Sequence, residues 1–175
     1  FLRQECNTIQ TAQDIPEGQY GFAAAEGSMT VGQMLAHVAA STNFHYQLHG
    51  VDKRADLTMQ DFGAYMGQAQ AIQSALTTKA EIIDALTTRG EEFATFLESL
   101  TDAQLSEFVT FPAGLVPPTK SRFEMLLGAK EHEMHHRAQL MLMQRLLGIT
   151  PHLTRRRQEA NAARAAAAAA ATAAS

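Results

Sequence analysis

The segment Lys120–Leu147 restricts the fold of this chain more than any other part of the sequence. Apolar residues recur along it at helical spacing, so it predicts one long helix that ends at Gly148 and cannot resume at Pro151. On such a helix His132 and His136, four residues apart, lie on the same face. The rest of that face is apolar and has the pattern of a core face: Met125, Ala129, Leu140, Met143 and Leu147.

The same helix carries a second apolar stripe, roughly opposite the two histidines. A helix that is apolar on two faces must bury both, either at the centre of one chain or against a second copy. In a bundle of this size we expect a homodimer with two-fold symmetry that forms through this last long helix. The stripe consists of Phe123, Leu127, Met134, Ala138 and Met141.

Capping boxes mark where other helices begin. In such a box a Thr side chain accepts a hydrogen bond from the amide three residues later, where Glu or Gln returns the bond. The boxes at residues 30–33 and 78–81 predict helices over about 30–48 and 79–99. A third box at residues 101–104 predicts one further short helix.

The remaining segments predict one more helix of the bundle and several shorter elements. Residues 1–13 read as a helix, and residues 14–29, which Pro and Gly interrupt, as a connection. Weaker periodicity over 57–66 predicts a short helix. Residues 108–118 combine strand-forming residues with prolines, so we expect a loop or small hairpin there and no sizeable sheet. The fold class is therefore all-α, a four-helix bundle with short extra helices and a Pro/Gly-rich loop before the last long helix.

The length of 175 residues predicts a single bundle domain over residues 1–150, followed by a tail over 151–175 that is basic and then nearly all alanine. The net charge is −4, and the tail is basic, so the bundle itself is acidic; this argues against nucleic acid as a partner. No apolar run approaches the ~20 residues that span a bilayer. The single cysteine, Cys6, fits a cytoplasmic protein, and no signal-peptide pattern is visible in the sequence from Phe1 onward.

A third histidine decides how the inward-facing pair is interpreted. His37 lies on the core stripe of the helix over 30–48, and neutral imidazole is the commonest protein ligand for zinc, nickel or iron(II). We predict that His37, His132 and His136 bind one divalent metal ion. The alternative is a purely structural bundle without a metal site, in which core hydrogen bonds satisfy the histidines. His45 and His49 form a rival pair, which we expect to be partly exposed near the helix end.

Residues 132–136 also match H-E-x-x-H, the helix motif of zinc peptidases in which the glutamate acts as a base. The pattern is short, and such peptidases need a third ligand. Glu159 follows the motif only beyond Pro151, in the basic tail. On a helix Glu133 lies about 60° from His136 and about 100° from His132, and nothing marks it as a base. A zinc hydrolase is therefore the less favoured alternative.

Two histidine segments together resemble the DinB-like superfamily of bacterial four-helix proteins. They are Leu35-Ala36-His37 and His132-x-x-His135-His136-Arg137-Ala138-Gln139-Leu140, and the resemblance covers nearly all of residues 1–150. Members often have Gly where this chain has Ala138. The resemblance implies an up-down-down-up bundle, usually dimeric, that binds a divalent ion through three histidines corresponding to His37, His132 and His136, with His135 as a neighbour.

Characterised relatives in that superfamily include metal-dependent transferases and isomerases that use mycothiol, bacillithiol or a similar low-molecular-weight thiol. The resemblance thus implies a metal-dependent transferase whose cofactors are a divalent ion (zinc, nickel, iron or manganese) and such a thiol. The chemistry is consistent, because an ion with three imidazole ligands keeps open positions where water or a thiol loses a proton. A non-catalytic, stress-associated metal-binding bundle is the alternative, and the sequence assigns no catalytic side chain.

Overall fold

The computed structural model describes the backbone of residues 2–173 and the side chains of residues 7–172; Phe1, the side chain of Cys6 and the last two residues of the tail lie outside the described part. The α-helices are α1 (Leu2–Asp14), α2 (Val31–His45), α3 (Met59–Ala75), α4 (Lys79–Glu98), α5 (Asp102–Ser106), α6 (Arg122–Leu146) and α7 (His152–Ala173). The remaining elements are a 3₁₀ turn, η1 (Glu17–Gln19), a π-helical segment, η2 (Tyr46–Val51), and two strands, β1 (Phe108–Thr110) and β2 (Thr119–Ser121).

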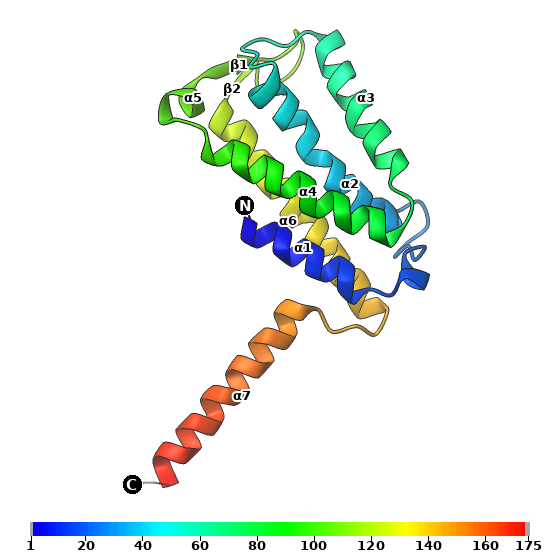
Figure 1. Cartoon of the computed structure of the whole chain (residues 1–175), viewed down its shortest axis with the longest axis vertical. Helices are drawn as coiled ribbons and strands as arrows, with labels where there is room; N and C mark the ends of the chain where they lie inside the picture. Colours follow the sequence, from blue (N-terminus) through cyan, green and yellow to red (C-terminus); the bar gives the residue numbers. More distant parts are fainter. Residues whose placement is uncertain (1, 174–175) are drawn as a thin grey trace.

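Four helices, α1, α2, α4 and α6, form the bundle (Figure 1). The crossover helix α3 packs beside α2 and returns the chain, so that α2 and α4 run in the same direction while α1 and α6 run opposite to them (Figure 1). This is the up-down-down-up order, and the all-α prediction is confirmed. The only sheet among the described residues is the antiparallel pair β1–β2, in which Val109 lies opposite Lys120. It confirms the small hairpin predicted before the last long helix.

The predicted helix starts at Thr30, Thr78 and Thr101 are confirmed, each with a complete capping box. A further box, Thr58 with Asp61, begins α3, which extends to Ala75 and is much longer than the helix predicted over 57–66. The two glycines inside α3 are exposed and contact no other side chain, so each costs only its helix propensity of about 1 kcal/mol. The box and the neighbouring α2 outweigh that cost.

The core lies where the four bundle helices meet. Val31 and Leu35 of α2, Ile82 of α4 and Leu140 of α6 are almost fully buried. Each such side chain contributes about 1.5–3 kcal/mol relative to an exposed one. On α6 the predicted core face is buried as expected, whereas most of the second stripe lies at the surface, with Met134 42% exposed. Only one of the two apolar faces of α6 is therefore buried within this chain.

The tail is a single helix, α7, that leaves the bundle after its first turns (Figure 1). His152 is buried, and its Nε2 lies 3.1 Å from Oδ1 of Asn7. The Arg155 guanidinium donates to Asp14 at 2.7 Å. Contact with the bundle thus continues just past residue 150, and the alanine-rich remainder is exposed as far as residue 172.

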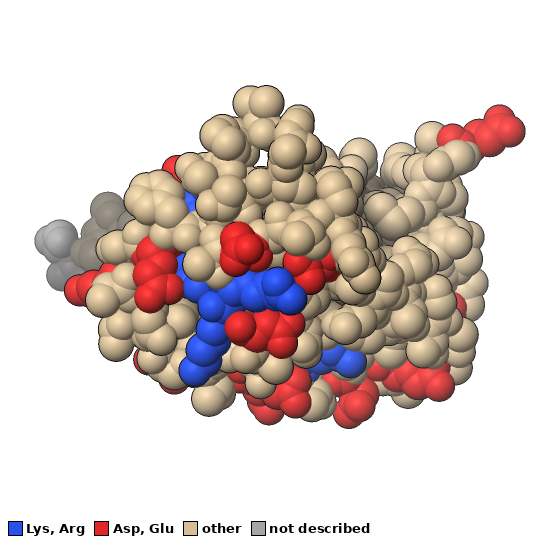
Figure 2. Space-filling model, turned by 90° about the horizontal axis from the view of Figure 1, so that it is seen from above, with Lys and Arg blue, Asp and Glu red and all other residues tan. Residues whose placement is uncertain are grey.

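Charged side chains on the end of the molecule that carries the hairpin lie close to one another. Figure 2 shows this end from above, with basic side chains directly beside acidic ones. The ion pairs there include Arg54 with Asp61 at 3.0 Å and Arg122 with Glu107 at 2.9 Å. Within residues 2–173, none of the helices combines the length and the apolar character that crossing a membrane requires.

Candidate metal centre

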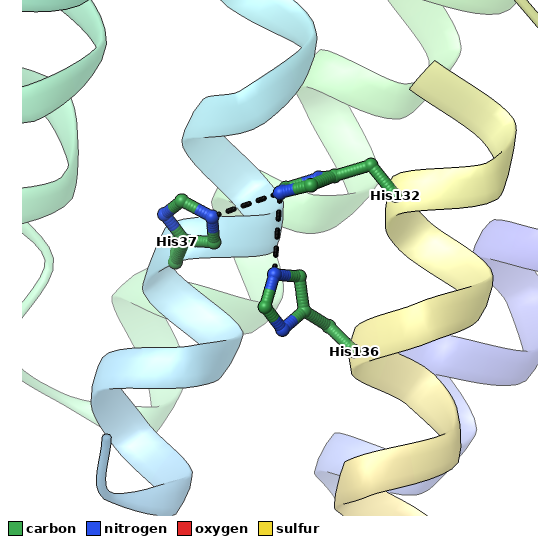
Figure 3. Close-up of side chains that lie close together, drawn as sticks. All are labelled: His37, His132 and His136. Carbon is green, nitrogen blue, oxygen red and sulfur yellow. Dashed lines mark hydrogen bonds between the residues drawn. The ribbon is translucent and has the colours of Figure 1, made fainter. Parts of the chain in front are cut away.

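Three imidazole rings from α2 and α6 meet in the space between these helices (Figure 3). Nε2 of His132 lies 3.0 Å from Nε2 of His37 and 3.2 Å from Nε2 of His136. One ring nitrogen from each residue lies within 4.8 Å of the other two. The structure thus brings together the three histidines that the sequence singled out, although they are separated by up to 99 positions in the chain.

Glutamine side chains hold the outer nitrogens of two of these rings. Nδ1 of His37 lies 3.0 Å from Oε1 of Gln73 on α3, and Nδ1 of His136 lies 2.8 Å from Oε1 of Gln139. An amide oxygen only accepts hydrogen bonds, so each Nδ1 carries the proton and each Nε2 presents a lone pair to its neighbours. Outer partners of this kind orient histidine ligands in metal sites.

Sequence reasoning missed both glutamines. Gln139 follows His136 by three residues, so helical spacing could have identified it as a neighbour on the same face. Gln73 lies on a helix whose length the sequence underestimated, and only the packing of α3 on α2 places it against His37.

Two of the three clustered histidines, His132 and His136, are uncharged near neutral pH. Burial lowers the pKa of His132 to about 4, and the neighbouring His136 and His37 add to the shift. Burial also lowers the pKa of His136. With lone pairs of His37 and His136 both directed toward His132, one Nε2–H of His132 can satisfy only one of them. A cation shared by the three nitrogens satisfies all of them, so the residues present fit a divalent ion.

The glutamate of the H-E-x-x-H pattern lies on another side of α6. Glu133 is buried, its Oε1 accepts a hydrogen bond of 2.6 Å from the Thr8 hydroxyl on α1, and Arg137 lies 3.5 Å from the same oxygen. Burial raises the pKa of Glu133. The carboxylate therefore joins α6 to α1, and Glu159 on α7 is exposed. Neither glutamate belongs to the histidine cluster, so the arrangement of a zinc peptidase is not formed.

The prediction that His45 and His49 form a partly exposed pair is wrong for His49, which is only 3% exposed. The chain continues from α2 into the π-helical segment η2. There the rings of His45 and His49 stack with their centroids 5.8 Å apart. Nδ1 of His49 accepts a hydrogen bond of 2.9 Å from the buried Arg122, which also donates to Glu107. Burial, with His45 and Arg122, lowers the pKa of His49 to about 3. These contacts connect η2 to the start of α6.

A cavity of about 380 Å³ adjoins two of the three histidines. It lies between α2, α3 and α6, and the rings of His37 and His132 form part of its wall. A small molecule in the cavity would therefore contact the histidine cluster directly.

Comparisons with known proteins agree with this architecture. A model of the DinB superfamily matches residues 1–140. The uncharacterized protein YjoA of Bacillus subtilis (strain 168) is 25% identical over 151 residues, which cover 86% of this chain and 88% of YjoA.

Two solved structures resemble the fold. The crystal structure of the DinB-like protein YjoA from Bacillus subtilis superposes with a TM-score of 0.64 at 22% identity, covering 86% of this chain and 90% of YjoA. The crystal structure of the mycothiol-dependent maleylpyruvate isomerase superposes with a TM-score of 0.57 at 14% identity, covering 79% of this chain and 57% of the isomerase. The superfamily match spans most of the sequence, including all three clustered histidines, and this chain belongs to the DinB superfamily.

Proposed function

We propose that this protein binds one divalent metal ion through His37, His132 and His136 and acts as a metal-dependent transferase on a small thiol, or on water. The convergence of three ring nitrogens within 4.8 Å carries the proposal. The glutamine partners of His37 and His136 support it, because they direct the free nitrogens toward a common point. Zinc, nickel, iron(II) and manganese are the candidate ions.

A divalent ion held by three imidazoles keeps open positions at which a thiol or water gives up its proton near neutral pH. The residues of this chain prepare the site for that role. The three histidines hold the ion, the glutamines fix the ring orientations of His37 and His136, and the adjoining cavity offers space for a reacting partner. A thiol is favoured over water because one protein of similar fold is a mycothiol-dependent isomerase.

An assay of thiol consumption tests this function. Purified protein loaded with each candidate ion would be incubated with glutathione, cysteine, mycothiol or bacillithiol and with an electrophile such as a haloarene, while free thiol is measured over time. We expect thiol consumption above the uncatalysed rate with at least one ion, and none with His132→Ala. Bound metal without consumption of any of these thiols would favour the non-catalytic metal-binding bundle instead.

The outer partner of His37 should affect metal affinity without being a ligand. Gln73→Leu removes the acceptor of the Nδ1 proton, so the ring loses its fixed orientation. We expect the dissociation constant for the ion to rise by about 10–100-fold, the range typical of such partners. Competition with a chromophoric chelator measures the change. Gln68→Leu, an exposed change on the same helix, is the matched control, and equal affinities for the two variants would contradict this role.

We further propose that the exposed stripe on α6 joins two copies of the chain. Phe123 is 56%, Leu127 39% and Met134 42% exposed, so the stripe is an apolar surface of the kind that partners cover. Met134→Glu should convert dimers to monomers in size exclusion with light scattering, because a carboxylate would be buried unpaired. Met59→Glu changes another exposed methionine, on α3, and should leave the dimer intact. A monomeric wild-type protein would refute the interface.

A further inference from the structure

The cavity beside the histidines has the size of a small-molecule site. Its volume of about 380 Å³ falls within the range of roughly 300–1,000 Å³ that is common for ligand pockets. His37 and His132 form part of its wall. Residues of α3 form another part, and among them Met66 is 48% exposed at the surface.

Apolar side chains make most of the wall. The rings of Phe44 and Phe62 meet edge to face with centroids 5.6 Å apart, and Met66 lines the cavity with them. The facing positions on α3 and α6 include Ala69 and Ala129, whose small side chains leave the space open. This arrangement suits a flat or branched apolar body that can contact aromatic rings.

Apart from its histidines, the cavity is lined by side chains that carry no formal charge. Its described lining contains no lysine, arginine, aspartate or glutamate. Two of its polar side chains already have partners, since the Ser41 hydroxyl donates to the carbonyl of Val38 at 2.8 Å and Gln73 contacts His37. Burial lowers the pKa of His45 to about 4, so this imidazole is uncharged at neutral pH. Away from the histidine end, where the proposed ion would lie, a charged group that entered would lose its hydration without gaining a counter-charge from a side chain.

We propose that this cavity binds the body of the second substrate and that this substrate is a small, uncharged and mainly apolar electrophile. The inference rests on the proposed transferase function, since only the neighbouring metal site gives the bound molecule something to react with. Phe44, Phe62 and Met66 contact the apolar body, and its reactive end lies toward His37 and His132. Along the apolar wall, away from the proposed metal site, selectivity comes from excluding charge, because no side chain there is placed to pair with one.

A matched pair of fluorescent probes tests the cavity without any turnover. N-phenyl-1-naphthylamine is uncharged, and 1-anilinonaphthalene-8-sulfonate carries the same ring system with one negative charge. We expect the uncharged probe to bind metal-free wild-type protein at least about tenfold more tightly, because the sulfonate would enter without a counter-charge. Both titrations are followed by the rise in emission on binding.

Variants locate the bound probe. Met66→Lys adds a charge at the cavity wall and should weaken binding of the uncharged probe at least about tenfold. Ala69→Phe fills the cavity without adding charge and should have a similar effect. Met59→Lys makes the same change as Met66→Lys at an exposed position of the same helix outside the cavity, and should bind like wild type. Circular dichroism confirms that each variant is folded.

Two results would overturn the inference: equal affinity for both probes, or binding that Met66→Lys and Ala69→Phe leave unchanged. The second result would also reveal a probe bound to the exposed stripe on α6. Titrations with and without zinc separate this inference from the proposed function. Cavity binding in a protein that takes up no metal would refute the metal site alone, whereas zinc uptake without cavity binding would refute the cavity alone.

Discussion

Replacing His132 with alanine should abolish stoichiometric metal binding. Its Nε2 is the common neighbour of the other two rings, at 3.0 and 3.2 Å, so the variant keeps one imidazole on α2 and one on α6 with nothing between them. We expect affinity to fall by more than about 100-fold, because loss of an outer partner alone typically costs 10–100-fold. Elemental analysis of desalted protein should change from about one ion per chain to a small fraction of that.

Other histidines of the chain provide the controls for this experiment. His135→Ala alters an exposed imidazole next to the cluster on the same helix, and His152→Ala alters one at the start of α7. His45→Ala removes a ring from the cavity wall. All three should retain the ion, whereas His37→Ala and His136→Ala should lose it. Full metal content in His37→Ala would exclude the site as described, since both ligands of α6 alone would then be sufficient.

Removing the ion should lower the melting temperature by about 8–16 °C. The three ligands come together only in the folded chain, so the ion stabilises the folded state by about 4 kcal/mol when its free concentration is 1,000 times the dissociation constant. For a chain of this length each kcal/mol shifts the midpoint by about 2–4 °C. Differential scanning calorimetry of metal-loaded and chelator-stripped protein measures the difference.

The variant His132→Ala supplies the reference for the melting experiment. Adding the same ion to this variant should leave its midpoint unchanged, because the specific site is lost. Identical midpoints for loaded and stripped wild-type protein would contradict a contribution of the ion to folding. An equal shift in wild type and variant would show that the ion acts at the surface.

The sequence was informative about the histidine cluster because helical geometry is regular. Four-residue spacing places His132 and His136 on one face, and the apolar residues of α2 indicate which way His37 points. The structure brings the three together, and their role as ligands stays a prediction. Bundle order followed from the superfamily resemblance, since periodicity alone does not determine how helices are arranged.

Features that depend on packing or on irregular backbone were not predictable in the same way. Nothing in local sequence distinguishes the π-helical end of α2, which buries His49 against Arg122, from an ordinary frayed helix. The length of α3 was missed because only Tyr65 is buried among its residues, so its periodicity is weak. The cavity is defined by space between three helices, which no single segment encodes.

Few side chains of α3 are buried, and this affects how the site responds to a bound molecule. Elements with few buried side chains open at low free-energy cost and exchange their amide hydrogens quickly, and α3 has only Tyr65 in the interior. A bulky ligand therefore displaces α3 more easily than the other cavity walls. The same helix carries Gln73, the partner of His37. A guest that pushes α3 outward would release that imidazole from its fixed orientation. The size of a bound molecule would thus affect a proposed metal ligand through one amide side chain.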